Sequence, residues 1–190
     1  MPQVFIGTTE IRIPQDSLIL ICGSQNSGKT TFTTKHFDTQ YVVNTDQAFE
    51  DVINHQATCF DTKDTILEKT TDLFEKRLRA AITRGPYTVV DAAPVEFQNR
   101  VAMINEFKGF RKNIILIVLD IKYPTLISRP RKKPTANKLK HNFVPAPDEE
   151  LLMNAMLITA QISRGQIGYK TTRTYVLSEK DVPKCKVFLE

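Results

Sequence analysis

Residues 23 to 31, G-S-Q-N-S-G-K-T-T, have the composition of a phosphate-binding loop. They fit the pattern G-x-x-x-x-G-K-[ST], with Gly23, Gly28, Lys29 and Thr30 at its fixed positions. Such a loop wraps backbone N–H groups around phosphates, and the helix that follows points its positive end at them. Glycine is required where the backbone takes a positive φ or closely approaches a phosphate oxygen. An apolar strand should precede this loop and a helix should follow it.

The loop predicts a bound nucleotide, which we expect to be ATP or another triphosphate such as GTP. In this arrangement the lysine reaches the β- and γ-phosphates, and the hydroxyl of Thr30 contacts Mg²⁺. The two expected cofactors are therefore the nucleotide and Mg²⁺. The residues expected to contact the nucleotide are Gly23, Ser24, Gln25, Asn26, Ser27, Gly28, Lys29, Thr30 and Thr31.

Three aspartates follow apolar runs that read as strands. Asp46 follows Y41-V-V-N-T, Asp91 follows Y87-T-V-V, and Asp120 follows N113-I-I-L-I-V-L. The carboxyl ends of parallel strands form the edge where α/β sheets bind ligands. Kinase chemistry needs one carboxylate to accept a hydroxyl proton and another to hold the metal. Asp46 is our candidate base, while spacing alone leaves Asp91 and Asp120 equal as metal ligands; any of the three could instead cap a helix.

The positive charge of the chain is concentrated in one segment. The net charge is +5, yet no Asp or Glu occurs from Lys122 to Pro147, and the remainder of the chain is net acidic. Such a segment is either a solvated loop or a surface that contacts a polyanion. Its basic residues are Lys122, Arg129, Arg131, Lys132, Lys133, Lys138 and Lys140.

The elements that must position these residues alternate between strand and helix. We expect strands at 17–22, 41–46, 87–91, 113–121 and 171–177, and helices at 30–37, from 47, 62–83, 96–107 and 147–163. The strands are nearly continuous apolar runs, as in a sheet covered on both faces. The expected fold is an α/β, P-loop NTPase-type three-layer sandwich with a central parallel sheet and a basic lid. The opening segments 3–6 and 10–14 are expected to pair as a hairpin.

The whole chain, 1–190, is expected to be a single domain, with the lid at about 122–147 and no element assigned to the tail 178–190. No apolar run approaches the length of about 20 residues that spans a bilayer, and the first residues do not resemble a signal peptide. Cys22, Cys59 and Cys185 are too scattered for a disulfide framework. We therefore expect a cytoplasmic protein with no membrane partner.

Taken together, these motifs resemble the 5′-hydroxyl polynucleotide kinases of phage and bacterial end-healing and nucleic-acid repair. The shared features are the loop, V43-N-T-D, T88-V-V-D-A, the basic R129-P-R-K-K and F143-V-P-x-x-x-E-x-L. The resemblance implies ATP-dependent phosphoryl transfer to a 5′-hydroxyl RNA or DNA end. It implies that Asp46 is the general base, that Lys29 and Thr30 hold phosphates and metal, and that Arg129 or Arg131 clasps the donor phosphates. Asp91 matches the aspartate of the family's D-x-T-N segment, and the resemblance implies that Asp91, rather than Asp120, lies beside the loop and contacts the water shell of Mg²⁺.

The chain departs from the family pattern on the acceptor side. Phe49 stands where the family usually has an arginine that engages the acceptor phosphate, and Ala93 and Pro94 replace Thr and Asn of D-x-T-N. Other cations could hold the acceptor's phosphates instead. The candidates are Arg100, Lys132, Lys133, Lys138 and Lys140.

Two other classes of protein share such a loop. One is a small-molecule kinase, and the other is a nucleotide-binding protein or assembly ATPase without a phosphorylated acceptor. The basic lid favours a polymeric anion over a small acceptor. For the polynucleotide kinase, the expected partners are a 5′-hydroxyl polynucleotide and other end-healing or ligase proteins.

Overall fold

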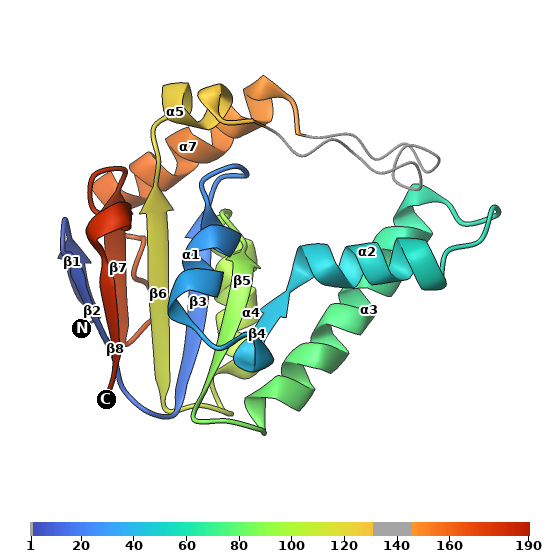
Figure 1. The fold of residues 1–190 in the computed structure, drawn as a ribbon, viewed down its shortest axis with the longest axis horizontal. Coiled ribbons are helices and arrows are strands. Elements are labelled where there is room, and N and C mark those ends of the chain that lie inside the picture. The colour runs from blue at the N-terminus through green and yellow to red at the C-terminus, as the bar shows by residue number, and fades with distance from the viewer. Residues whose placement is uncertain (1, 131–145) are drawn as a thin grey trace.

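A computed structural model describes residues 2–130 and 146–190 of the protein. The fold is built around a six-stranded, wholly parallel sheet (Figure 1). The strand order is β1-β7-β6-β3-β5-β4. The strands are β1 (Gln3–Ile6), β3 (Ser17–Gly23), β4 (Val42–Asn44), β5 (Tyr87–Ala93), β6 (Asn113–Asp120) and β7 (Arg173–Ser178). The expected α/β sandwich with a parallel sheet is confirmed.

β3 lies at the centre of the sheet, and every one of its residues is buried. It pairs with β5 on one side and with β6 on the other. The chain therefore places β4 and β5 to one side of β3 and then crosses to the opposite side with β6. Such a reversal opens a crevice at the carboxyl ends of the strands, where α/β proteins bind ligands. The phosphate loop begins at that end of β3.

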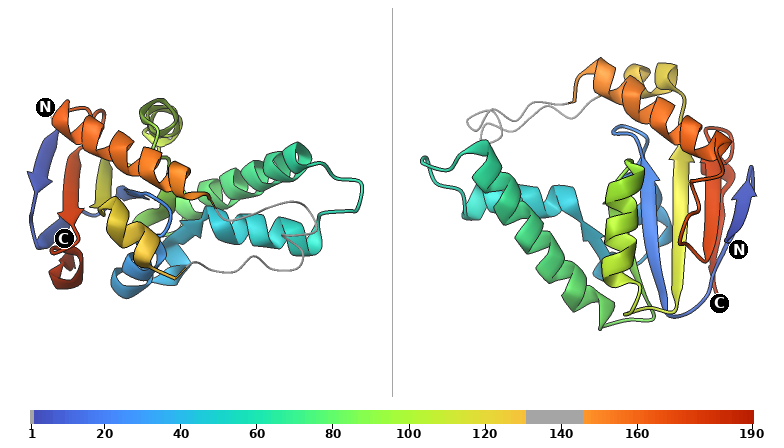
Figure 2. Two further views of the ribbon diagram at one scale, coloured as in Figure 1. Left: turned by 90° about the horizontal axis from the view of Figure 1, so that it is seen from above. Right: turned by 180° about the vertical axis from the view of Figure 1, so that it is seen from behind.

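Helices cover both faces of the sheet. α1 (Lys29–His36) packs on one face through Phe32, while α3 (Lys63–Ile82) and α4 (Phe97–Phe107) pack on the other through residues such as Leu78 and Ile104. α2 (Thr45–His55) packs against α3, and the pair projects sideways from the sheet (Figures 1 and 2). α5 (Tyr123–Ser128) and α7 (Asp148–Ser163) lie across the carboxyl ends of the strands.

The expected N-terminal hairpin is wrong. β1 pairs in parallel with β7 at the edge of the main sheet, whereas β2 (Glu10–Ile13) pairs in parallel with β8 (Lys186–Leu189) in a separate two-stranded sheet. Ile11 and Ile13 are fully buried against the α1 face of the main sheet. β2 thus buries its two isoleucines by pairing with the tail, whereas β1, whose residues stay exposed, extends the edge of the main sheet by backbone pairing with β7.

Two strand boundaries differ from expectation near the candidate site. β4 ends at Asn44, so Asp46 lies in the first turn of α2 and not at a strand end. β5 continues two residues beyond Asp91, and its register with β3 shifts between Ile21 and Cys22. The sequence also gave no indication of α5, whose first turn contains Pro124. None of the helices within the described ranges has the length and apolarity needed to cross a membrane.

Candidate active site

The backbone of the loop takes the conformation that its glycines permit. Gly28 has φ 93° and Asn26 has φ 67°, both in the left-handed region. A Cβ at Gly23 would lie 2.7 Å from Oγ of Ser27, so only glycine leaves room for that hydroxyl. The hydroxyls of Ser24 and Ser27 are buried and accept or donate no hydrogen bond within the described structure. The loop thus holds polar groups that a phosphate could satisfy.

Lys29 lies at the centre of this loop. Its Nζ donates to the carbonyl oxygens of Gly23 at 2.8 Å and Ser24 at 2.9 Å. Burial lowers the pKa of Lys29, while negative charge on Cys22, Asp91 and Asp46 acts in the opposite direction. Because the hydrogen bonds of this ammonium go to two loop carbonyls, it can exchange them for the oxygens of an anion.

Asp91 is a buried carboxylate with one oxygen unused. Its Oδ2 accepts a hydrogen bond of 2.7 Å from Nδ2 of Asn44, whereas Oδ1 has no hydrogen-bond partner among the described residues. Burial raises the pKa of Asp91, and the nearby Thr30 side chain and Lys29 ammonium lower it. A free carboxylate oxygen beside a threonine hydroxyl has the chemistry that Mg²⁺ prefers. These two residues therefore fit the expected metal.

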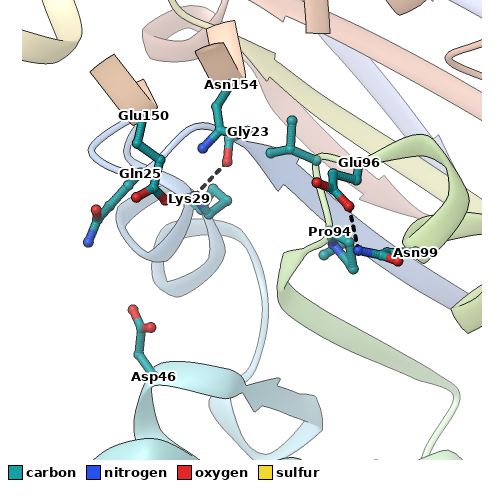
Figure 3. A pocket seen from close by; sticks show the side chains of 11 residues that line it. Gly23, Gln25, Lys29, Asp46, Pro94, Glu96, Asn99, Glu150 and Asn154 are labelled. Atoms are coloured by element: carbon teal, nitrogen blue, oxygen red, sulfur yellow. Dashed lines mark hydrogen bonds between the residues drawn. The ribbon is translucent and has the colours of Figure 1, made fainter. Parts of the chain in front are cut away.

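Asp46 faces the loop from the other side. It is exposed in the first turn of α2, and Figure 3 shows its carboxylate pointing from α2 toward the loop. The alternative role of helix cap belongs to Asn44, whose side chain accepts from the backbone N–H of Gln47 at 3.1 Å. Asp46 is thereby left free to interact with a ligand.

A cavity of about 430 Å³ lies between the loop and the start of α2, with Lys29 and Asp46 in its lining (Figure 3). The loop contributes Gly23, Gln25 and Lys29, and α2 contributes Asp46. The opposite wall was not predicted from the sequence. Part of this wall is the segment after β5, and the position of Asp91 near the carboxyl end of that strand could have suggested it. The part contributed by α7 is not indicated by any pattern in its local sequence. These unpredicted wall residues are Pro94, Val95, Glu96, Asn99, Glu150 and Asn154.

Arg129, which follows α5, is docked on the loop. Its Nη1 donates to the carbonyl oxygen of Asn26 at 3.0 Å. The side-chain amide of Asn26 in turn donates to the carbonyl oxygens of Leu126 at 2.7 Å and Arg129 at 3.1 Å. The side chain of Asn26 therefore holds α5 against the loop, and only its backbone is available to a nucleotide.

The structure does not place Arg100 where it could contact nucleic acid. Arg100 is 2% exposed on the inner side of α4, which corrects the expectation that it binds the acceptor's phosphates. Asp120 lies at the end of β6 with an oxygen 4.0 Å from Nζ of Lys122. Five candidate lid residues lie outside the described residues, namely Arg131, Lys132, Lys133, Lys138 and Lys140.

The AAA domain family matches residues 18–152, which is most of the chain and includes every element that carries the loop and the aspartates. The chain belongs to the AAA domain family. No curated protein matches the sequence.

Solved structures that are similar to this AAA domain include the following two. One is a chain in the structure of the Pnkp1/Rnl/Hen1 RNA repair complex, with a TM-score of 0.59 and 16% identity over 81% of this chain. This AAA domain spans 47% of the length of that chain. The other is shikimate kinase from Bacteroides thetaiotaomicron, with a TM-score of 0.47 and 14% identity, covering 88% of this chain and 95% of that one. The family match, which includes the loop, and the first of these structures support an α/β P-loop fold, and in such a fold the loop binds a nucleotide.

Proposed function

We propose that the protein is a kinase that transfers the γ-phosphoryl group of ATP to the 5′-hydroxyl end of a polynucleotide. The observation that carries this proposal is that Lys29 and Asp46 line one cavity while Lys29 also interacts electrostatically with Asp91, the partner of Thr30. A phosphate cradle, a free carboxylate and a metal-binding pair are the parts that phosphoryl transfer requires. The likeness to a chain from an RNA repair complex supports the choice of acceptor.

The proposed reaction needs little covalent chemistry from the protein. The acceptor's hydroxyl oxygen attacks the γ-phosphorus and forms the new P–O bond, while the bond from that phosphorus to the β–γ bridging oxygen breaks. Asp46 accepts the proton of the hydroxyl. Lys29 exchanges its loop carbonyls for phosphate oxygens and stabilises the charge that develops on the transferred group. ADP leaves with the bridging oxygen.

Thr30 and Asp91 are the residues that would hold Mg²⁺. The bound ion would supply positive charge to the phosphates during transfer. Asp91 must be ionised for this role, and its raised pKa reflects the cost of keeping a charge buried there. Asn44 orients the Asp91 carboxylate by binding Oδ2, and Oδ1 is left available to bind a ligand.

The direct test is incubation with γ-labelled ATP, Mg²⁺ and oligonucleotides that carry either a 5′-hydroxyl or a 5′-phosphate. We expect label only on the 5′-hydroxyl RNA or DNA. Lys29→Met should abolish transfer, whereas Lys35→Met, an exposed lysine on the same helix, should leave it unchanged. Release of labelled phosphate with no labelled oligonucleotide would instead indicate an ATPase, and would overturn the proposal.

The cavity wall also favours a second candidate, a kinase for a small, uncharged polyol. Opposite the loop, the wall carries the exposed carboxylates of Glu96 and Glu150 together with the amides of Asn99 and Asn154. Carboxylates and amides bind hydroxyl groups well, whereas carboxylates repel phosphates. A polynucleotide must therefore place its hydroxyl end in the cavity and its phosphates outside.

Paired substitution of these carboxylates separates the two candidates. For a polynucleotide acceptor, Glu96→Gln with Glu150→Gln should improve oligonucleotide affinity, and most strongly at low salt, because two nearby negative charges that repel its phosphates are removed. For a polyol kinase, the same change should weaken use of sugars and nucleosides without affecting oligonucleotides. Glu68→Gln with Glu75→Gln on α3 gives a control of equal charge outside the cavity wall.

A further inference from the structure

Arg100 is a buried cation without an acidic partner among the described residues. It is 2% exposed, and none of the ion pairs within the described ranges includes it. Its Nη1 donates to the carbonyl oxygens of Pro94 at 3.0 Å and Val95 at 2.9 Å, and its Nη2 donates to Oε1 of Gln161. Arginine keeps its charge even when buried, so these neutral oxygens must stabilise it.

The oxygens that hold Arg100 belong to the wall of the cavity. Pro94 and Val95 line it directly, on the segment between β5 and α4. Gln161 braces the same segment, because its Nε2 donates to the carbonyl oxygen of Val95 at 3.0 Å. Gln161 is on α7, the helix whose first half contributes Glu150 and Asn154 to the cavity.

The same guanidinium reaches the strand that enters the phosphate loop. Nη1 of Arg100 lies 3.9 Å from Sγ of Cys22, the residue that precedes Gly23, and Cys22 donates from Sγ to the carbonyl oxygen of Pro94 at 3.5 Å. Burial raises the pKa of the Cys22 thiol, although the Arg100 and Lys29 charges oppose that rise. Arg100 therefore lies where the loop strand, the wall after β5, and α7 meet.

We propose that Arg100 is a positioning residue for the acceptor, which fixes the wall at Pro94 and Val95 relative to the phosphate loop and α7. The proposal rests on the function given above, because it assumes that the acceptor occupies this cavity. The planar fork of arginine binds Pro94, Val95 and Gln161 together, whereas the single ammonium of a lysine cannot hold all of them in the same geometry. Positioning the wall is a different role from stabilising the core. A buried arginine far from the cavity would stabilise the fold without affecting acceptor binding.

Hydrogen exchange tests the positioning without any assay of activity. In Arg100→Lys we expect the amides of residues 100–103, the first in α4 whose N–H groups donate hydrogen bonds, to exchange about tenfold faster, because a lost hydrogen bond to a charged group changes a local equilibrium by about that factor. Arg111→Lys is the matched control. Arg111 is 9% exposed and donates to Asp16 and Thr88, at the opposite end of the strands from the cavity. Equal exchange of residues 100–103 in the two variants would overturn the proposal.

If Arg100→Lys does not fold, Gln161→Met provides a second variant for the same hydrogen-exchange measurement. This substitution removes the brace between α7 and Val95 while leaving the bonds from Arg100 to Pro94 and Val95. The same segment should again exchange faster than in Arg111→Lys. Unchanged exchange in Gln161→Met would show that α7 does not position the wall, which contradicts the proposal.

Kinetics gives the second readout. In Arg100→Lys, the KM for a 5′-hydroxyl oligonucleotide should rise by about tenfold or more, because a small displacement of a positioning wall is costly to catalysis. The Kd for ATP should stay close to that of wild type. Equal losses in both constants would overturn the proposal. Should wild type phosphorylate no oligonucleotide, the proposed function fails, and hydrogen exchange still decides whether Arg100 positions the wall.

Discussion

Asn44 donates a hydrogen bond of 2.7 Å from its Nδ2 to Oδ2 of Asp91. Its Oδ1 accepts from the backbone N–H of Gln47 and so caps α2, the helix whose first turn contains Asp46. One side chain therefore connects the carboxylate assigned to the metal with the helix that carries the proposed base. The pair follows from register, because Asn44 and Asp91 are direct partners in the β4–β5 pairing.

Replacing Asn44 should separate its two roles. Asn44→Ala loses both the cap and the contact with Asp91, and we expect a loss of stability of about 1–2 kcal/mol with a decrease in transfer of about 10–100-fold. Asn44→Ser can still cap α2 but is too short to reach Asp91. It should recover most of the thermal stability but not the rate, and recovery of both would show that the Asp91 contact is unimportant.

Asp91 should make the protein less stable as pH rises. Its folded pKa is raised above the ordinary value of 3.8, chiefly by burial, so the folded state binds the proton more tightly than the unfolded chain. Stability therefore falls as pH increases from about the ordinary value through the raised one. Without nucleotide or metal at pH 7, Asp91→Asn should unfold at a higher temperature than wild type, because the buried charge is removed. Thermal unfolding across pH measures this; an unchanged pH profile in Asp91→Asn would contradict it.

The same carboxylate should determine the requirement for metal. In Asp91→Asn, the Mg²⁺ concentration for half-maximal transfer should rise by about tenfold or more. Asp120→Asn is the control, because Asp120 lies beside Lys122 and does not perturb Lys29. A larger shift in Asp120→Asn than in Asp91→Asn would exchange the roles of the two residues.

Asp46 should affect rate and not stability. General-base assistance is worth about 10²–10⁴-fold, so Asp46→Asn should reduce transfer by that amount at saturating ATP and oligonucleotide. Its stability should change little, since Asn44 supplies the cap and Asp46 is exposed. Measured rates close to wild type in Asp46→Asn would remove Asp46 from the mechanism. A folded but inactive variant is the expected result.

Arg129 should contribute at the donor phosphates. Arg129→Ala should slow transfer at saturating oligonucleotide by up to about 10³-fold, because a guanidinium at this place can stabilise transition-state charge. Asn26→Gly is the comparison, since glycine keeps the left-handed backbone but loses the bonds that hold α5. If loosening α5 alone reproduces the whole defect of Arg129→Ala, the arginine acts only through docking.

Local patterns in the sequence determined the phosphate loop and the elements that flank it. The run 17–22 forms β3 and the segment 62–83 contains α3. A continuous apolar run and a helical spacing of apolar residues each indicate, without other information, which residues are buried. The parallel sheet followed from the alternation of such segments. The left-handed Gly28 and the buried position of Asp91 both follow from rules that act within a few residues.

The tertiary structure alone decided which distant residues meet. The pairing of β1 with β7 and of β2 with β8 joins opposite ends of the chain, and no local pattern records it. The same holds for Arg100, whose place inside the protein depends on Gln161 of α7, 61 residues away. A single charged residue on a helix reads as a surface residue until the packing of other elements shows which oxygens surround it. The cavity wall, built from the segment after β5 and from α7, exists for the same reason only in the folded chain.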